Sequence, residues 1–519
     1  MEGVCVVSQE ESEPLRPQHS PTKSLAQLES RFKFRRIAGN ADVSLRGITL
    51  SSSDVRKGDL FVGVRGVERH GARFADRARE NGAVAVLTDA VGAEQALSSG
   101  LPILVADDPR AILGEVCSWI YETASMTSPL FGVTGTNGKT STVHFLEAIL
   151  RQMGVVTGLS STAERHIGDL RMVSGLTTPE STDLHALLAR MREDGVGAVA
   201  VEVSAQALTR NRVDGVIFDV AGFTNLSHDH LDDYDNMQSY LEAKAGLFKP
   251  DRSRRAVVSL DSPWGAKLRQ MADVPVATIV SQPSTDADWQ VIVTSEEQTG
   301  VRFTLSSRDG ASMSSRIPVI GRHMAANAGL AIAMLVEGGF RLADIDAALA
   351  QKDGIDVYLP GRSELVSGEH GPAVFVDFGH SPDAFVNTLD AVRKVTAGRV
   401  IMVFGADGDR DASKRPAMAE AAVQGSDLLI ITDHHPRFED PASIRAALMK
   451  AARAADPEHE TIEVPDPKRA IREAVRLARE GDSILWAGPG HQNYRDIRGK
   501  HVPYSARSEA RNALAEAGW

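Results

Sequence analysis

Residues 135–141, GTNGKTS, have the composition and spacing of a loop that binds the phosphates of a nucleotide. Glycines let backbone N–H groups approach phosphate oxygens, and the N-terminus of a following helix adds partial positive charge. Lys139 would reach the β- and γ-phosphates, and the Thr140 hydroxyl would bind Mg²⁺. The expected nucleotide contacts form one continuous segment: Gly135, Thr136, Asn137, Gly138, Lys139, Thr140 and Ser141.

This loop departs from the usual pattern at one position, because Val133 stands where that pattern has its first glycine. An apolar run precedes the loop and a helical pattern follows it, so we interpret Val133 as the last inward-facing residue of a strand. The competing interpretation is an ordinary strand-to-helix turn that happens to contain Gly-Lys-Thr. A phosphate loop does not identify a reaction, since several classes of enzyme use one.

Polar residues also follow two later strand-like runs. Glu202 ends the buried run AVAVE, and His230 lies in FTNLSHDHLDDY after the next run. Because the carboxyl ends of parallel strands share one edge of a sheet, both are candidate Mg²⁺ ligands beside the phosphate loop. Histidine is an unusual ligand for a hard cation, and Asp229 or Asp232 could equally cap a helix. Lys244 lies in a helical stretch, where spacing alone favours a solvated surface lysine.

Strands and helices alternate in three segments that would position these residues. Residues 24–127 predict a small α/β domain, 128–357 a longer βα alternation with an antiparallel patch near 285–320, and 358–519 another α/β domain. Continuous apolar strands between helices indicate parallel sheets covered on both faces. Residues 1–23 do not resemble a signal peptide, and we interpret them as a flexible leader.

The composition excludes several classes of protein. The chain has 519 residues and a net charge of −12, which argues against a general nucleic-acid binder. No apolar run approaches the roughly 20 residues of a membrane span. Cys5 and Cys117 provide no disulfide framework and suit a reducing cytosol. We therefore expect a cytoplasmic protein that uses neither nucleic acid nor membrane as a partner.

Several motifs, in this order along the chain, resemble those of the Mur ligase family. The motifs are GVTGTNGKTST, LTTPESTDLHALL, VEVSAQAL, GFTNLSHDHLDDY, EAKAGLF, GRHMAANAGLAIA, LPGRSE, VDFGHSPDA, VFGADGDRDASKRPAMAEAA and AGPGHQNY. The resemblance covers nearly all of residues 45–510. It implies a UDP-binding N-terminal domain, a central ATPase domain and a Rossmann-like C-terminal domain that binds an amino acid.

The resemblance also implies a reaction, that of an ATP-dependent amide ligase in cytoplasmic peptidoglycan precursor synthesis. ATP would phosphorylate a carboxylate of UDP-MurNAc-L-Ala-D-Glu, and the amine of diaminopimelate, lysine or another diamino acid would attack the acyl phosphate. Mg²⁺ and Lys139 would neutralise the approaching anions. The expected partners are the UDP-linked muramoyl dipeptide and a free amino acid, bound by a monomer.

Roles for individual residues follow from the same resemblance. The catalytic residues would be Lys139, Glu202, His230 and a carbamylated Lys244, and the metal ligands Thr140, Glu202, His230 and Lys244. Further ATP contacts would be Asn327 on the adenine side, with Asp377 and His380 in the C-terminal domain. The acceptor nucleotide would contact Ser52, Thr177, Thr178, Ser204, Arg210 and Arg212. The amino acid would contact Arg410, His434, His435, Arg437, Gly488 and Gln492.

The chain departs from the family pattern where the amino acid is expected to bind. His434 and His435 stand where Asp and Asn are usual, and Gln492 replaces Glu. Losing two negative charges disfavours a second ammonium group on the amino acid, unless Asp433 or Glu439 takes over as its partner.

Further departures lie near the expected acceptor site, at Leu176, Gln206 and Arg210. Two alternatives therefore stay open. One is a paralogue with an altered amino acid or acceptor in a specialised pathway. The other is a non-catalytic ATP-binding protein, against which the intact Lys139 and Lys244 argue.

Overall fold

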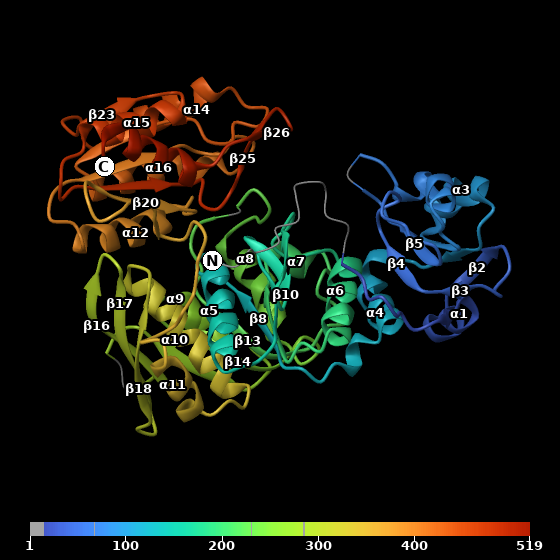
Figure 1. The fold of residues 1–519 in the computed structure, drawn as a ribbon. Helices are drawn as coiled ribbons and strands as arrows, with labels where there is room; N and C mark the ends of the chain where they lie inside the picture. Colours follow the sequence, from blue (N-terminus) through green and yellow to red (C-terminus); the bar gives the residue numbers. More distant parts are fainter. Residues whose placement is uncertain (1–14, 67, 230, 284–285) are drawn as a thin grey trace.

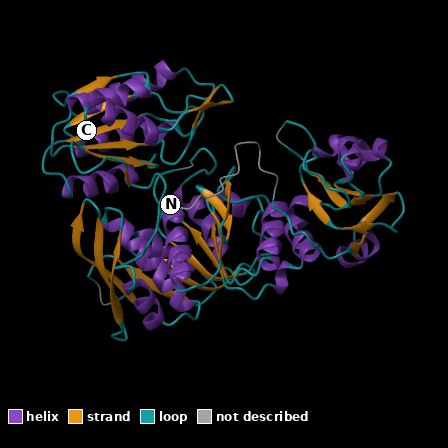
Figure 2. Ribbon diagram, viewed as in Figure 1, coloured by secondary structure: helices purple, strands orange, loops and turns teal. Residues whose placement is uncertain are grey.

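The computed structural model describes residues 15–66, 68–229, 231–283 and 286–519. Three lobes follow one another along the chain, from the blue N-terminal lobe through the green and yellow central lobe to the red C-terminal lobe (Figure 1). Each lobe contains a β-sheet with helices packed against it (Figure 2). The predicted α/β class with three domains is confirmed. None of the described helices is long and apolar enough to cross a membrane.

The N-terminal lobe is built on a five-stranded sheet in which all neighbours are parallel except the edge strand β2. The sheet order is β2 (Arg35–Ala38), β7 (Ile103–Val105), β6 (Ala85–Thr88), β5 (Asp59–Gly63) and β4 (Gly47–Thr49). The short strands β1 (Lys23–Ser24) and β3 (Ser44–Leu45) form a separate pair. The helices are α1 (Leu25–Phe32), α2 (Ala75–Glu80), α3 (Ala90–Ala96) and α4 (Pro109–Tyr121).

The central lobe contains an eleven-stranded sheet, parallel in its middle and antiparallel at both edges. Its order is β11 (Leu170–Val173), β10 (Glu164–Ile167), β9 (Thr157–Ser160), β12 (Ala198–Glu202), β8 (Leu130–Thr134), β13 (Phe218–Phe223), β14 (Ser253–Ser259), β15 (Val276–Val280), β16 (Trp289–Glu297), β17 (Gly300–Ser307) and β18 (Ser312–Ile317). The antiparallel strands β16, β17 and β18 fall within the predicted antiparallel patch.

Helices cover both faces of this central sheet. One apolar layer joins the sheet to α5 (Lys139–Gln152), α10 (Arg322–Glu337) and α11 (Leu342–Ala350). The opposite layer joins it to α6 (Ser181–Glu193), α7 (Ala205–Thr209), α8 (Met237–Ala245) and α9 (Pro263–Met271). Successive residues of β8 alternate between the layers, since Leu130 packs with the second and Phe131 with the first. This double cover explains why the central strands are continuously apolar.

The C-terminal lobe has a six-stranded sheet that is parallel except for its edge strand β19. Its order is β19 (Glu364–Leu365), β20 (Ala373–Asp377), β24 (Ser483–Ala487), β21 (Val400–Phe404), β22 (Leu428–Ile431) and β23 (Thr461–Glu463). The helices are α12 (Pro382–Lys394), α13 (Arg415–Gly425), α14 (Pro441–Ala455), α15 (Pro467–Leu477) and α16 (Ala506–Ala517). A hairpin of β25 (Tyr494–Ile497) and β26 (Lys500–Pro503) projects from this lobe.

Residues 15–24 connect the first two lobes. The Arg16 guanidinium donates a hydrogen bond to Asp59 of β5 at 2.5 Å, and both groups are buried. In the central lobe, the Glu193 carboxylate accepts hydrogen bonds from two successive backbone N–H groups of this segment at 2.6 and 2.9 Å. Residues 1–14 of the expected flexible leader lie outside the described residues, whereas its remainder is held by these contacts.

Candidate active site

The phosphate loop joins the carboxyl end of β8 to the first turn of α5. Gly135 and Gly138 have φ angles of 150° and 87°, which only glycine adopts without strain. A Cβ atom on Gly135 would lie 1.9 Å from the Thr224 hydroxyl, and one on Gly138 would lie 2.6 Å from the Asn327 side chain. Both glycines are therefore required by the conformation and by the close neighbours of the loop.

A cavity of about 350 Å³ opens between this loop, α10 and the C-terminal lobe, a size within the usual range for small-molecule sites. Its lining includes Asn137, Gly138, Thr140 and Ser141 from the loop region and Asn327 from α10. From the C-terminal lobe it includes Arg362, Asp377, Asp383 and Asn387. Four of the seven predicted phosphate contacts and the predicted adenine contact thus lie around one cavity, whereas Gly135, Thr136 and Lys139 do not line it.

The two predicted ATP contacts of the C-terminal lobe are placed differently. Asp377 lines the cavity, but its carboxylate already accepts hydrogen bonds from the backbone N–H groups of Ser363 at 2.8 Å and Gly379 at 2.6 Å. His380 does not line the cavity, and its Nε2 lies 3.6 Å from Asp229. Asp377 therefore shapes the loop, and His380 contacts the central lobe.

Two lysines meet at a single carbonyl oxygen of the phosphate loop. Lys139 donates to the Gly135 carbonyl at 3.1 Å and Lys244 to the same oxygen at 2.8 Å. Lys244 is only 1% exposed and its ammonium lies 4.3 Å from the centre of the Tyr240 ring. Burial, reinforced by the charge of Lys139, holds the pKa of Lys244 well below its ordinary value. The interpretation of Lys244 as a solvated surface lysine is therefore wrong.

Oxygen ligands for a cation lie beside these lysines. The Thr140 hydroxyl donates to the Glu202 carboxylate at 3.0 Å, and the same carboxylate accepts from the Thr162 N–H at 2.9 Å. The Lys139 ammonium lies 4.0 Å from Glu202. A hydroxyl and a buried carboxylate suit a hard cation such as Mg²⁺. The other predicted ligand of this group, His230, lies outside the described residues.

Arg362 is a candidate functional residue that the sequence interpretation missed. Its guanidinium donates to the Thr140 hydroxyl at 2.9 Å and stacks 4.3 Å from the centre of the Phe378 ring. It therefore brings a cation from the segment before β19 to the phosphate loop. The sequence feature that could have identified Arg362 is its place in the motif LPGRSE, between two α/β segments.

Replacing Arg362 with alanine is expected to lower kcat/KM for ATP by about ten- to hundredfold, because a partly buried cation that lines the cavity and contacts Thr140 would be lost. Steady-state phosphate release at varied ATP concentration measures this effect. Arg393, which pairs with Asp427 on the surface, is the control, and its alanine variant should be unchanged. Equal kinetics for both variants would show that Arg362 has no role in ATP use.

Most residues predicted to bind the acceptor nucleotide lie near the carboxyl end of β12. Thr178 donates to the Glu202 carbonyl at 2.8 Å, and Ser204 caps α7. The Arg212 guanidinium donates to Glu180 at 2.9 Å, whereas Arg210 is largely exposed, with Asp233 at 3.6 Å. Thr177 accepts a hydrogen bond from Thr162 at 2.9 Å. The remaining residue, Ser52, lies in the separate N-terminal lobe.

The residues predicted to bind the amino acid come from three loops at the carboxyl edge of the C-terminal sheet. Arg410 follows β21, His434 to Arg437 follow β22, and Gly488 and Gln492 follow β24. The His435 side chain forms a hydrogen bond with Gln492 at 2.7 Å, and a Cβ atom on Gly488 would lie 3.5 Å from the His434 ring. Parallel topology explains how these distant segments come together, since ligands bind at this edge of α/β sheets.

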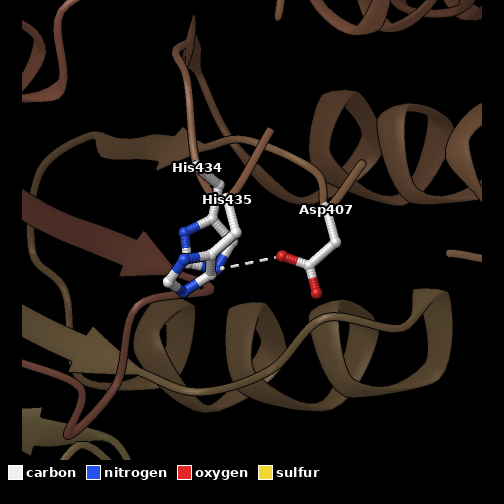
Figure 3. A group of neighbouring side chains, drawn as sticks. All are labelled: Asp407, His434 and His435. Atoms are coloured by element: carbon white, nitrogen blue, oxygen red, sulfur yellow. Dashed lines mark ion pairs between the residues drawn. The ribbon is translucent and has the colours of Figure 1, made fainter. Parts of the chain in front are cut away.

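A neighbouring carboxylate completes this group of side chains. Asp407, His434 and His435 point toward one another, with His434 Nε2 lying 3.6 Å from the Asp407 carboxylate (Figure 3). The Arg437 guanidinium lies 3.7 Å from the same carboxylate. Asp407 is thus a further charged group at this edge that the sequence interpretation did not single out.

The central and C-terminal lobes are joined by a buried ion pair. The Lys414 ammonium donates to the Asp229 carboxylate at 2.8 Å, and about one tenth or less of either side chain is exposed. Beside it, His228 lies 3.3 Å from Asp411. These contacts hold the carboxyl edges of the two sheets close to each other.

Replacing Lys414 with methionine is expected to lower kcat by about ten- to hundredfold, because the Asp229 carboxylate would lose a buried partner that joins the lobes. Phosphate-release kinetics would measure the loss of activity. Small-angle scattering would measure the accompanying loss of closure between the central and C-terminal lobes. Lys468, an exposed lysine paired with Glu509, provides the methionine control. Unchanged kinetics in the Lys414 variant would contradict the proposed role of this pair.

Comparison with known proteins agrees with this architecture. The chain matches the Mur ligase middle domain over residues 133–335, the Mur ligase glutamate ligase domain over 361–490 and the Mur ligase catalytic domain over 44–124. A UDP-N-acetylmuramyl-tripeptide synthetase of Leifsonia xyli subsp. xyli is 56% identical over 97% of this chain and 98% of its own. A UDP-N-acetylmuramoyl-L-alanyl-D-glutamate–2,6-diaminopimelate ligase of Streptomyces coelicolor is 40% identical over 96% and 98%.

Solved structures give the same result. A UDP-N-acetylmuramoyl-L-alanyl-D-glutamate–2,6-diaminopimelate ligase has a TM-score of 0.66 at 26% identity and covers 96% of this chain and 100% of its own. The MurF ligase of Thermotoga maritima in complex with ADP has a TM-score of 0.61 at 17% identity over 91% and 96%, which shows the fold.

The chain therefore belongs to the Mur ligase family, as its motifs predict. It is an ATP-dependent ligase that forms an amide bond in the synthesis of peptidoglycan precursors.

Proposed function

We propose that this ligase attaches an amino acid to UDP-MurNAc-L-Ala-D-Glu, forming the third residue of the peptide. The observation that carries the proposal is the cavity where the phosphate loop meets the carboxyl edge of the C-terminal sheet. ATP and an amino acid bound at these two edges would both reach the carboxylate of a nucleotide held at the end of β12. The names of the relatives support this acceptor.

Two displacements would form the amide bond. In the first, a carboxylate oxygen of the dipeptide attacks the γ-phosphorus of ATP and displaces ADP, which yields an acyl phosphate. In the second, the neutral amine of the amino acid attacks the acyl carbon, and phosphate leaves with its bonding electron pair while the amine loses a proton. Lys139 and Arg362 would stabilise the negative charge of the transferred phosphoryl group.

Thr140 and Glu202 would hold Mg²⁺, and the carbamylated Lys244 and His230 are the further ligands that the resemblance implies. When bound, the ion would reduce the charge of the phosphates that the carboxylate must approach. The hydrogen bonds of Lys139 to the Gly135 and Thr136 carbonyls keep its ammonium directed toward the same region.

The proposal is tested by measuring phosphate release from ATP in the presence of UDP-MurNAc-L-Ala-D-Glu and a panel of amino acids. Mass spectrometry of the product identifies the residue added. We expect release that depends on both the dipeptide nucleotide and one class of amino acid. If no amino acid stimulates release, the proposed acceptor is wrong, and other UDP-linked carboxylates should then be substituted in the same assay.

A further inference from the structure

Two carboxylates near the amino-acid loops are already bound to arginines. Glu439 accepts hydrogen bonds from both terminal nitrogens of Arg415, at 2.8 and 2.7 Å. Asp433 is paired with Arg445, and the Arg495 guanidinium lies 3.8 Å away. The expectation that one of these carboxylates replaces the missing acidic residues therefore has no support, because each is neutralised within the protein.

Asp407 is different, because one of its carboxylate oxygens lacks a hydrogen-bond partner. Its Oδ1 is buried and makes no hydrogen bond within the described residues, although the side chain as a whole is 24% exposed. A buried carboxylate oxygen without a donor is costly, so a cationic donor that reached this oxygen on substrate binding would be bound favourably. The nearest ring nitrogen, Nε2 of His434, lies 3.6 Å away.

His435 is not available to a metal ion or as a counter-ion. Its Nδ1 accepts a hydrogen bond from the Asp496 N–H at 2.8 Å, so its Nε2 carries the proton and donates to the Gln492 amide oxygen at 2.7 Å. Both ring nitrogens of this neutral tautomer are therefore engaged. A metal ion bound by Asp407, His434 and His435 would require this arrangement to break.

His434 does not provide the missing charge either. Burial and its neighbour His435 hold the pKa of His434 well below its ordinary value, so its ring is neutral at physiological pH. Among the described residues, the arginine or lysine paired with the Asp407 carboxylate is Arg437, which lies 3.7 Å from Oδ2 and also 3.7 Å from the Asp496 carboxylate. Arg437 is therefore shared between two acids.

We propose that Asp407 binds the distal ammonium group of the incoming amino acid and so selects a diamino acid. This inference rests on the proposed function and names the group that its amino-acid site recognises. An ammonium at Oδ1 would supply the missing hydrogen bond and charge together. Arg410, exposed on the same loop and without an ion pair to any described residue, is free to meet the α-carboxylate.

The pairing of Arg437 has a consequence for the class of diamino acid. When Asp407 pairs with the ammonium, Arg437 remains 3.7 Å from the Asp496 carboxylate, so its charge is already balanced and it is a poor partner for a distal carboxylate such as that of diaminopimelate. The site therefore favours a diamino acid with one carboxylate, such as lysine, ornithine or 2,4-diaminobutyrate, over diaminopimelate.

The test compares amino acids that differ only in the distal group. Ornithine is paired with norleucine, and 2,4-diaminobutyrate with norvaline, so that a methyl group replaces the ammonium. We expect the wild-type enzyme to prefer the better diamino acid over its neutral analogue by about a hundredfold in kcat/KM. In Asp407→Asn this preference should fall to within about threefold, through a raised KM for the diamino acid, with the KM for ATP unchanged.

A matched control separates recognition from damage. Glu439→Gln removes the negative charge of the alternative carboxylate, which pairs with Arg415. This variant should keep the wild-type preference for the diamino acid over its neutral analogue. General damage to the site in Asp407→Asn would lower turnover of both members of a pair equally, and that result would overturn the proposal. If the kcat/KM for diaminopimelate equals that for the monocarboxylic diamino acids, the assignment of Arg437 is wrong.

Calorimetry measures amino-acid binding without turnover. The amino acids are titrated into the enzyme together with its nucleotides. Tighter binding of the diamino acid that is lost in Asp407→Asn supports the inference even if the acceptor is not UDP-MurNAc-L-Ala-D-Glu. Equal binding of the paired amino acids to the wild-type enzyme refutes it. Absence of turnover with a normal binding preference would instead count against the proposed acceptor.

Discussion

Replacing Lys244 with alanine is expected to lower the rate of amide formation by about a hundred- to a thousandfold. The side chain is fully enclosed, and its nitrogen lies 2.8 Å from the Gly135 carbonyl in the phosphate loop. Burial lowers the pKa of this lysine, which favours the neutral amine that carbamylation requires, and a carbamate formed there would add anionic oxygens beside Glu202. Steady-state phosphate release measures the loss.

A second substitution distinguishes the carbamate from the ammonium. Lys244→Arg keeps a cation but cannot be carbamylated, so we expect it to be as inactive as the alanine variant, with thermal melting confirming that it folds. Carbon-13 NMR of the wild-type enzyme in labelled bicarbonate should show a carbamate signal that Lys244→Ala lacks. Lys249→Ala removes an exposed lysine paired with Asp273 and should be fully active. Activity retained in the arginine variant would exclude a carbamate.

Replacing Lys139 with alanine is expected to reduce kcat by about a hundred- to a thousandfold while the protein remains folded. Its ammonium is held by the carbonyls of Gly135 at 3.1 Å and Thr136 at 2.8 Å, so its position is set before ATP binds. The loss should fall mainly on kcat, because the phosphoryl group gains its contact with the lysine as it is transferred.

Binding experiments check that interpretation. ADP and ATP affinities measured by calorimetry should fall much less in Lys139→Ala than turnover does. Lys267→Ala, which changes an exposed lysine beside Trp264, serves as the control for mutation of a lysine in the same lobe. If ATP affinity falls as much as kcat, Lys139 contributes to ground-state binding and not to phosphoryl transfer.

The sequence predicted those parts of the fold and site that depend on local pattern. Apolar runs of five or six residues located β8, β12, β13 and β20, because each strand is covered on both faces. Gly135 and Lys139 were recognisable because one short loop carries the whole phosphate-binding pattern. Spacing gave the wrong environment for Lys244, since a short helix does not reveal what packs around it, and the family resemblance corrected it.

The remaining features depend on contacts between distant segments. Strand β11 at the sheet edge and its neighbour β10 are short and partly exposed, so their composition did not distinguish them from loops. Arg362 and Lys414 acquire their roles only when the C-terminal lobe meets the central lobe. The sequence did not distinguish Asp407 from other charged loop residues, because the lack of a hydrogen-bond partner for its Oδ1 atom appears only when the site is assembled.

The segment 15–24 gives the N-terminal lobe a second mechanical attachment. A lobe joined by one flexible linker alone can move in any direction. Here the connection through residues 122–129 acts together with the Arg16 and Glu193 contacts and with an ion pair between Arg110 and Glu180 at 2.9 Å. Helix α4 also packs on α6, because Ala186 and Ala189 of α6 belong to the apolar core of the N-terminal lobe. The N-terminal lobe is therefore seated on the central lobe over an extended face, and α4 and α6 act as a fixed spacer between the first sheet and the second.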